Sequence, residues 1–113
     1  MMPHEPRPAL SHPPLEDVSI TEVFAALGDP TRLAIVQTLL LEPDGRACGT
    51  FPVSVAASTL SHHFKVLRTA GLIHQEDRGT KRWTTLRSEQ LEQRFPAVLS
   101  ALRDSISTKN PAH

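Results

Sequence analysis

Cysteine is almost absent from this chain of 113 residues, because Cys48 is the only one. A single thiol excludes a disulfide framework within the chain and fits a reducing compartment. Long apolar runs are also lacking, since none approaches the ~20 residues that span a bilayer, and the first residues show no signal-peptide pattern. We therefore expect a cytoplasmic protein that has no membrane partner.

Net charge is lacking too, because twelve Lys and Arg balance twelve Asp and Glu. The charges are nevertheless segregated: residues 1–58 carry −4, residues 59–87 carry +4, and residues 88–113 are balanced. Charges further apart than about 8–10 Å are largely screened in physiological salt, so a polyanion responds to the local charge. The basic block at 59–87 is therefore the expected contact region for nucleic acid.

The composition divides the chain into a domain and two tails. Five of the ten prolines fall within residues 1–17, which contain few apolar side chains. Such a stretch buries too little surface to offset the entropy lost on ordering, so we expect a disordered tail there and another over 109–113. Residues 18–108 are expected to form one domain.

Two helices are expected at the start of this domain. Ser19 is a suitable N-cap for the first. Asp29 followed by Pro30 suits the start of the second, since proline at the first helical position loses no hydrogen bond. Residues 46–57 contain glycine and proline, and the part from Val53 to Ala57 suits either a short helix or an extended chain. We expect one irregular turn or two of helix there.

A helix and a hairpin are expected next. Ser58 is a candidate cap for a helix that continues to about residue 70 and ends at Gly71, which suits a left-handed conformation. Strands are expected over 72–76 and 81–87, with a turn between them.

A final helix is expected from Ser88, its candidate cap, to about residue 108, and Pro96 should kink it or divide it in two. The chain is thus predicted to be mainly α with a small β-hairpin, in the order α-α-α-α-β-β-α.

The helix expected at 58–70 has two contrasting faces. Leu60, Phe64 and Leu67 form an apolar stripe, whereas hydroxyl, imidazole and cationic side chains occupy the other half. Such polar groups match base edges and phosphates, and a helix of this size fits the major groove. The basic hairpin suits phosphate or minor-groove contact. The candidate DNA-binding residues are Ser58, Thr59, Ser61, His62, Lys65, Arg68, Arg78, Lys81 and Arg82.

Two segments carry a family resemblance. The first is Leu27-Gly28-Asp29-Pro30-Thr31-Arg32-Leu33-Ala34-Ile35-Val36. It resembles the Leu-x-Asp-Pro-Thr-Arg-Leu-x-Ile-Leu opening of the ArsR/SmtB family of bacterial winged-helix repressors. The second runs from Thr59 to Ile73 and resembles the recognition helix of that family, usually Thr-Val-Ser-His-His-Leu-Lys-Val-Leu-Arg-x-Ala-Gly-Leu-Val. The two segments stand at the family's usual separation, and the resemblance covers roughly residues 19–105.

The resemblance implies a winged helix-turn-helix homodimer that binds a palindromic operator in double-stranded DNA and leaves it on receiving a signal. The apolar stripes of the first and last helices agree, since they exceed what a monomer of this size easily buries. The inducer would be a small molecule or an oxidant of unknown identity. The expected interface residues are Val23, Phe24, Leu27, Phe95, Val98, Leu99, Leu102 and Ile106.

The sequence departs from the family pattern in two places. The helix that normally precedes the recognition helix is replaced by the irregular stretch 48–57, so the support of the recognition helix must differ locally. Pro96 interrupts the last helix, which leaves the dimer geometry open.

Neither usual metal site of the family is present. Its metal-sensing members use a Cys-x-Cys or ligands on the last helix, whereas here Thr50 stands where a second thiolate would follow Cys48 and residues 88–108 contain no His. We therefore expect no metal and no cofactor. Cys48 is either a redox-sensing thiol or an inert small hydrophobe. His63 is expected nearer the buried side than His62, and Trp83 is expected to pack under the hairpin.

Two other classes of function compete with a DNA-binding regulator. An enzyme is not expected, and no catalytic residue is assigned, because the sequence contains no recognised nucleophile elbow, metal motif or phosphate loop. The second class is a winged-helix module whose basic face binds an acidic protein partner. Salt-sensitive binding to DNA would discriminate between that module and a DNA-binding regulator.

Overall fold

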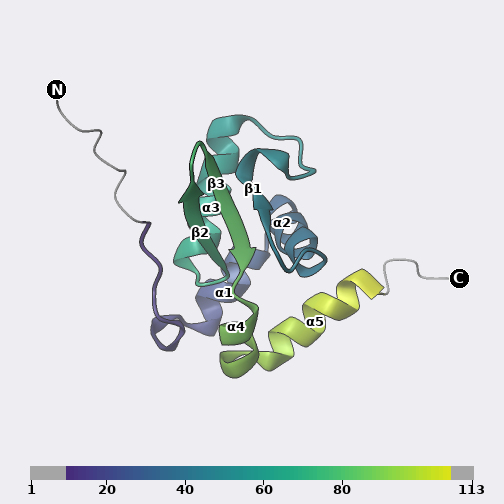
Figure 1. Cartoon of the computed structure of the whole chain (residues 1–113). Helices are drawn as coiled ribbons and strands as arrows, with labels where there is room; N and C mark the ends of the chain where they lie inside the picture. Colours follow the sequence, from purple (N-terminus) through teal and green to yellow (C-terminus); the bar gives the residue numbers. More distant parts are fainter. Residues whose placement is uncertain (1–9, 108–113) are drawn as a thin grey trace, which may run out of the picture.

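The computed structural model describes residues 10–107 and places helices around a small antiparallel sheet (Figure 1). The chain is mainly α with a β-hairpin, as the sequence predicts. The elements in chain order, with η for a 3₁₀ turn, are η1 (Leu15–Asp17), α1 (Ile20–Leu27), α2 (Pro30–Leu40), β1 (Arg46–Ala47), η2 (Cys48–Thr50), α3 (Ala57–Thr69), β2 (Ile73–Arg78), β3 (Lys81–Leu86), α4 (Ser88–Arg94) and α5 (Pro96–Ser107).

The first two helices begin at the predicted caps. Ser19 Oγ accepts a hydrogen bond from the backbone N–H of Glu22, and Glu22 Oε1 accepts one from the backbone N–H of Ser19. Asp29 accepts from the backbone N–H groups of Thr31 and Arg32 at 2.9 and 3.0 Å. The hydrogen bond from the Arg32 amide is the main reason why the pKa of Asp29 lies below its ordinary value.

The sheet contains a strand that the sequence did not predict. β1 pairs with β3, with Arg46 opposite Thr84 and Ala47 opposite Trp83, and the strand order is β1-β3-β2. Within 46–56 the expected irregular helical turn is present as η2, but the expectation is wrong for Arg46 and Ala47, which form a strand. A strand of two residues has no alternation to recognise, and its pairing depends on a partner far along the chain.

The hairpin is confirmed, with a tighter turn than predicted. β2 and β3 pair in register from Ile73 opposite Leu86 to Arg78 opposite Lys81. Only two residues therefore connect the strands, and Gly79 among them takes a positive φ of 65°. Such a turn matches the twist of the strands it joins.

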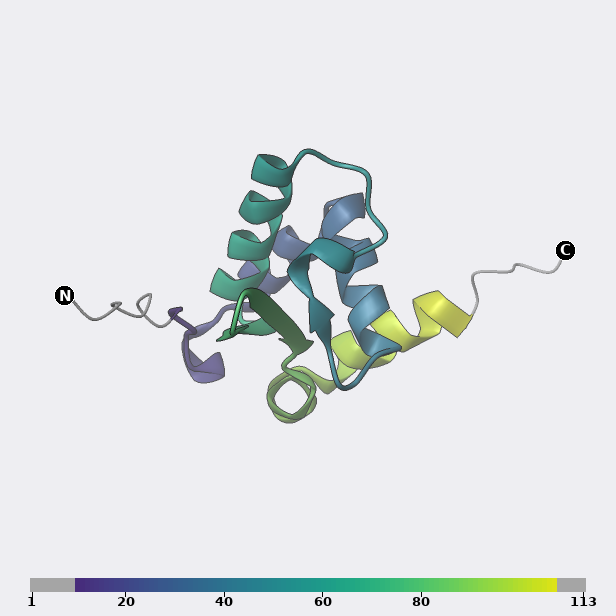
Figure 2. The same cartoon turned by 45° about the horizontal axis from the view of Figure 1, so that its top comes forward.

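The core lies where the helices meet one face of the sheet. Figure 2 shows α3 along one margin of the molecule, so that only one side of this helix packs inward. The largest fully buried side chains are Ile35, Leu39, Leu67, Leu72, Ile73, Leu91, Leu99, Val23, Val36 and Thr84.

The predicted break at Pro96 divides the last helix in two. α4 ends at Arg94 and α5 begins at Pro96, with Phe95 between them in a non-helical conformation. Figure 2 shows α4 end-on while α5 runs across the view, so the two helices differ in direction. The predicted cap Ser88 is wrong, because Arg87 occupies the N-cap position and makes no side-chain cap hydrogen bond.

Residues 10–17, predicted to be disordered, pack against the domain instead. Leu15 in η1 and the adjoining Val18 are buried. Both side chains lie directly beside Gly71. A Cβ added to Gly71 would lie 2.5 Å from Leu15 Cδ2 and 3.0 Å from Val18 Cγ2. The absence of a side chain at Gly71 therefore makes room for this segment. The remaining parts of the two predicted tails, 1–9 and 108–113, lie outside the described residues.

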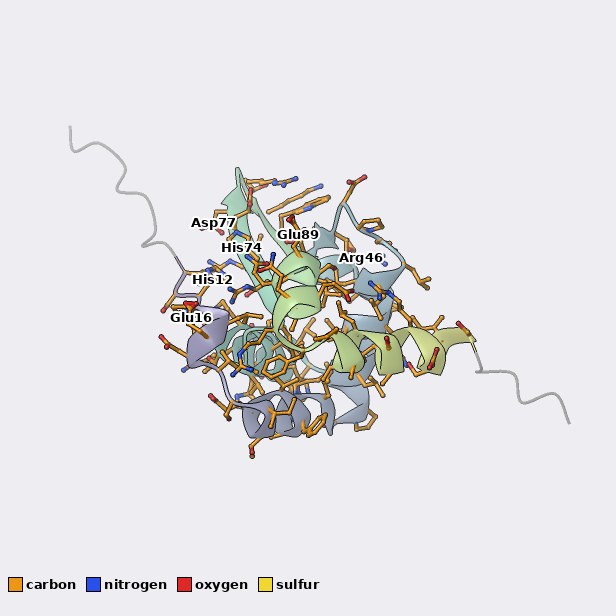
Figure 3. The ribbon with its side chains drawn as sticks, turned by 90° about the horizontal axis from the view of Figure 1, so that it is seen from below. His12, Glu16, Arg46, His74, Asp77 and Glu89 are labelled. Atoms are coloured by element: carbon orange, nitrogen blue, oxygen red, sulfur yellow. The ribbon has the colours of Figure 1, made fainter. Side chains whose placement is uncertain are left out.

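A histidine joins the same segment to the sheet. The backbone N–H of Gln75 in β2 donates to His12 Nε2 at 3.0 Å, and the His12 ring stacks on His74 with 4.3 Å between ring centroids (Figure 3). β2 is an edge strand, so this hydrogen bond satisfies a backbone group that the sheet leaves open.

Candidate nucleic-acid interface

Helix α3 presents the polar face that the sequence predicts. Phe64 and Leu67 are buried and Leu60 is half-buried, which anchors the apolar stripe. Ser58 lies within the helix instead of capping it, since Ala56 is the N-cap and has no side-chain cap hydrogen bond. The exposed residues of α3 include Ser58, Thr59, Ser61, His62 and Lys65.

His63 separates from His62, as expected. His62 is exposed, whereas His63 is buried and its Nδ1 accepts a hydrogen bond from Arg32 Nη1 at 3.0 Å. Arg32 Nε also donates to the Ala26 carbonyl at 2.7 Å. Arg32 thus connects the end of α1 to the buried side of α3. The sequence showed Arg32 only as part of a family motif, and no pattern in the sequence gave its contacts.

Two cations of the hairpin are exposed, but they differ in their partners. Lys81 is exposed, and no acidic side chain among residues 10–107 forms an ion pair with it. Arg78 is exposed too, but it pairs with Glu76 at 3.0 Å and lies over the Trp83 ring, 4.8 Å from its centroid. Trp83 is half-buried, and its Nε1 donates to the carbonyl of Asp44 at 2.8 Å. It therefore packs between the hairpin and the turn before β1.

Arg68 and Arg82, both predicted to contact DNA, lie on the inner side of the hairpin. Arg68 is half-buried and donates to Gln75 Oε1 at 2.6 Å. Arg82 pairs with Asp77 at 3.1 Å. Both arginines line a cavity between α3 and the sheet. The exposed cations of the predicted interface are therefore Lys65, Arg78 and Lys81.

Cys48 has the surroundings of an unreactive thiol. It is half-buried, with Sγ 3.2 Å from Thr84 Oγ1 and 3.1 Å from Gln75 Nε2. Burial raises the pKa of Cys48 above its ordinary value, so the thiol form is favoured over the reactive thiolate. The redox interpretation of Cys48 therefore has no support in its geometry.

The predicted dimer surface is only partly available. Val23, Val98, Leu99 and Leu102 are buried within the chain's own core, so they cannot form a contact surface between two copies. Leu27, Phe95 and Ile106 are half-buried. Phe24 is 60% exposed, and Ile20, which lies one turn earlier on α1 and was not predicted, is 39% exposed. Helical spacing alone did not separate inward-facing from outward-facing positions on these helices.

Neither a metal-ion cluster nor a membrane-spanning helix is found in the part of the chain that the structure describes. Within residues 10–107, no group of three or more His, Cys, Asp or Glu side chains is arranged to hold a metal ion. None of the described helices is long and apolar enough to cross a membrane.

Comparison with known proteins agrees with these features. A protein family described as "Helix-turn-helix domain" matches residues 27–76, which include α2, α3 and β2 up to Glu76. An uncharacterized HTH-type transcriptional regulator of Bacillus subtilis, YceK, is 32% identical over 89 residues, which cover 77% of this chain and 89% of that protein.

Solved structures extend the likeness to the fold. The crystal structure of an ArsR family transcriptional regulator superposes with a TM-score of 0.60 at 24% identity, covering 78% of this chain and 92% of the other. A homodimeric winged helix-turn-helix DNA-binding domain from Mycobacterium bovis, described as a possible ArsR-family regulator, also gives a TM-score of 0.60, at 22% identity and covering 83% and 86%. Such regulators are DNA-binding proteins and not enzymes. The chain belongs to the HTH-type transcriptional regulators, and its fold is the winged helix-turn-helix of the ArsR family.

Proposed function

We propose that this regulator is a homodimeric, cytoplasmic repressor that binds a palindromic operator through α3 and the β2–β3 hairpin and is released by a signal. The observation that supports the proposal most directly is the polar face of α3. Ser61, His62 and Lys65 are exposed together on a helix whose other side is held by Phe64 and Leu67. Hydroxyl, imidazole and ammonium groups can contact base edges and phosphates in the major groove.

Electrophoretic mobility shift with the intergenic DNA upstream of the gene tests DNA binding directly. The full-length chain should shift this duplex, and raising the salt concentration should weaken binding steeply because phosphate contacts release counterions. Unrelated duplex DNA should bind more weakly at the same salt concentration. Absence of any shift under reducing or oxidising conditions would favour the alternative that the basic face binds an acidic protein.

Lys65→Ala sharpens this test at one residue. The substitution should weaken operator binding about tenfold and reduce the slope of affinity against salt, because each phosphate contact contributes about one unit to that slope. Arg103→Ala is the matched control, since it removes one positive charge from an exposed residue of α5 that pairs with Glu92. Equal losses in the two variants would contradict the assignment of α3 to the groove.

The proposed dimer rests on the exposed aromatic side chain of Phe24. A large apolar residue that is 60% exposed fits a contact between two copies, and Ile20 extends the apolar surface by one turn. Phe24→Asp should shift the chain toward monomer in sedimentation velocity and lower operator affinity, without unfolding it. Lys65→Ala should leave the dimer intact. A wild-type chain that sediments as a monomer at all concentrations would overturn this part of the proposal.

A further inference from the structure

A cavity of about 490 Å³ lies between α3 and the sheet. Leu60 and Phe64 of α3 form an apolar wall. Facing them are Gln75 of β2, Arg82 of β3 and Cys48 of η2. Ligand pockets of proteins commonly span roughly 300–1,000 Å³ and combine apolar walls with a few placed polar groups. This cavity has that size and that composition.

A hydrogen-bond network organises the polar side of the cavity. Gln75 is 2% exposed, and its Nε2 donates to Thr84 Oγ1 and to Cys48 Sγ, each at 3.1 Å. Its Oε1 accepts from Arg68 Nη1 at 2.6 Å. The buried amide therefore has no unused hydrogen-bonding group, and it holds the guanidinium of Arg68 at the cavity wall in advance of any ligand.

The cavity carries an excess of positive charge. Within residues 10–107, no carboxylate lies within ion-pair distance of Arg68. Burial lowers the pKa of Arg68, and the like charge of Arg82 lowers it further. The two guanidinium groups therefore repel each other. Arg82 has one acidic partner, Asp77, while Lys65 adds a third cation to the cavity lining. An anion placed here would offset this repulsion.

A second cavity, of about 380 Å³ between α1 and α3, does not share this feature. Its arginine, Arg32, is already engaged by the Ala26 carbonyl and by His63. Its carboxylate, Glu22, belongs to the cap of α1. Lys65 lies at the lining of both cavities, so the groups that separate them are Arg68 and Arg82.

We propose that the cavity between α3 and the sheet binds a small organic anion. The guanidinium of Arg68, with Arg82, receives the anionic head group, since arginine presents several N–H donors in a planar fork that matches a carboxylate. The apolar part of the ligand lies against Leu60 and Phe64. A bare inorganic ion would leave that apolar wall uncovered, so a compact aromatic or aliphatic acid fits the cavity better.

The position of the cavity couples this ligand to DNA. Ser61 and Lys65 line the cavity and also belong to the exposed face of α3. A bound anion therefore neutralises positive charge that would otherwise attract the DNA phosphates. Provided that the proposed DNA binding holds, the ligand lowers operator affinity. Binding of the ligand itself does not depend on that function.

NMR titration of the full-length, ¹⁵N-labelled chain with benzoate tests the site. Benzoate should shift the backbone amides of Leu60, Gln75 and Arg82, whereas benzamide, its neutral counterpart, should bind at least about tenfold more weakly, because it lacks the charge. Arg68→Gln should weaken benzoate binding about tenfold, and Arg103→Gln should leave it unchanged. Equal shifts with benzoate and benzamide, or shifts confined to other elements, would overturn the proposal. If Arg68→Gln does not fold, Arg82→Gln replaces it.

Operator titrations with and without benzoate test the coupling. Benzoate should raise the apparent Kd for the operator in the wild-type chain and change it less in Arg68→Gln, at constant ionic strength maintained with chloride. An unchanged Kd in the wild-type chain, with benzoate bound by NMR, would overturn the coupling. If the chain does not bind DNA at all, the proposed function fails while the NMR titration still decides whether the site exists.

Discussion

At its C-terminal end, α3 closes with two backbone hydrogen bonds from the residues that follow it, whereas at its N-terminal end it has no side-chain cap. Gly71 N–H donates to the Arg68 carbonyl and Leu72 N–H donates to the Leu67 carbonyl, which is the Schellman arrangement. Ala56, the N-cap, has no side-chain acceptor, so it cannot accept a hydrogen bond from the first N–H groups of the helix through its side chain.

Burial follows the same division. Ala70, Leu72 and Ile73 are buried beyond the C-terminal end, and Leu15 packs against Gly71. The residues from Ala56 to Thr59 are all exposed. One end of α3 is thus fixed in the core, while the end expected to enter the groove is only lightly held. In the proposed mode of DNA binding, the more lightly held end is the one that meets the operator.

Gly71→Ala should have the largest effect on stability, because it disturbs the packing at the buried C-terminal end of α3. A side chain at a positive φ of 78° is strained, and its Cβ would meet Leu15 and Val18 at 2.5 and 3.0 Å. Together these effects should lower the free energy of unfolding by about 3 kcal/mol, measured by urea denaturation. Gly79→Ala is the control: its φ is also positive, but nothing lies within 4 Å of the added Cβ. The control should cost about 1 kcal/mol. Equal costs would show that the packing against Leu15 contributes nothing.

Ala56→Ser should have a smaller effect of the opposite sign at the lightly held end. The backbone of Ala56 is already extended, with φ −63° and ψ 152°, so a serine hydroxyl there can accept from a free N–H of the first turn. We expect a gain of about 1 kcal/mol, measured by thermal or urea unfolding. Ser19→Ala, which removes an existing cap from α1, should lose about as much. No gain from serine would mean that the first turn of α3 already has other acceptors for its N–H groups.

A pH change should produce the smallest effect, confined to the segment that covers the fixed end. Burial lowers the pKa of His12, helped by the nearby charges of His74, Arg68 and Arg87. Only the neutral ring accepts the N–H of Gln75, so the folded chain binds fewer protons at His12 than the unfolded chain does. The stabilisation is complete above about pH 6.5, the ordinary pKa of histidine, and is lost as the pH falls through the lowered folded-state pKa.

Amide exchange can follow this contact residue by residue. The protection factor of the Gln75 amide should fall between about pH 7.5 and about pH 5.5, because protonation of His12 removes its acceptor. The Leu39 amide inside α2 should show no such fall. In His12→Ala the Gln75 amide should be weakly protected at both pH values; strong protection there would show that His12 does not hold this edge.

Local signals in the sequence were sufficient where a residue acts through its neighbours. The caps Ser19 and Asp29, the end of α3 at Gly71 and the break at Pro96 depend on nearby backbone groups, and each was predicted correctly. Ser58 and Ser88 were wrong because serine also occurs inside the first turn of a helix, so the residue type alone does not fix the position of the cap.

Predictions failed where a contact joins distant parts of the chain. β1 exists because Arg46 and Ala47 pair with β3. The segment around Leu15 is ordered because Gly71 leaves room for it. Arg32 became important only when folding brought His63 beside it. In each case the two partners are far apart in the sequence, so no local pattern of residues could predict the contact.

The sequence by itself determined that helices flank a β-hairpin, which family the chain resembles, and that α3 has a polar face. These features follow from residue spacing and from short motifs. Only the tertiary structure decided which cations of that region face outward. Lys81 is exposed, whereas Arg82, the next residue of β3, turns toward a cavity beside Gln75. The reason is that a strand sends alternate side chains to opposite faces, and the face that receives each residue depends on which helix packs against the sheet.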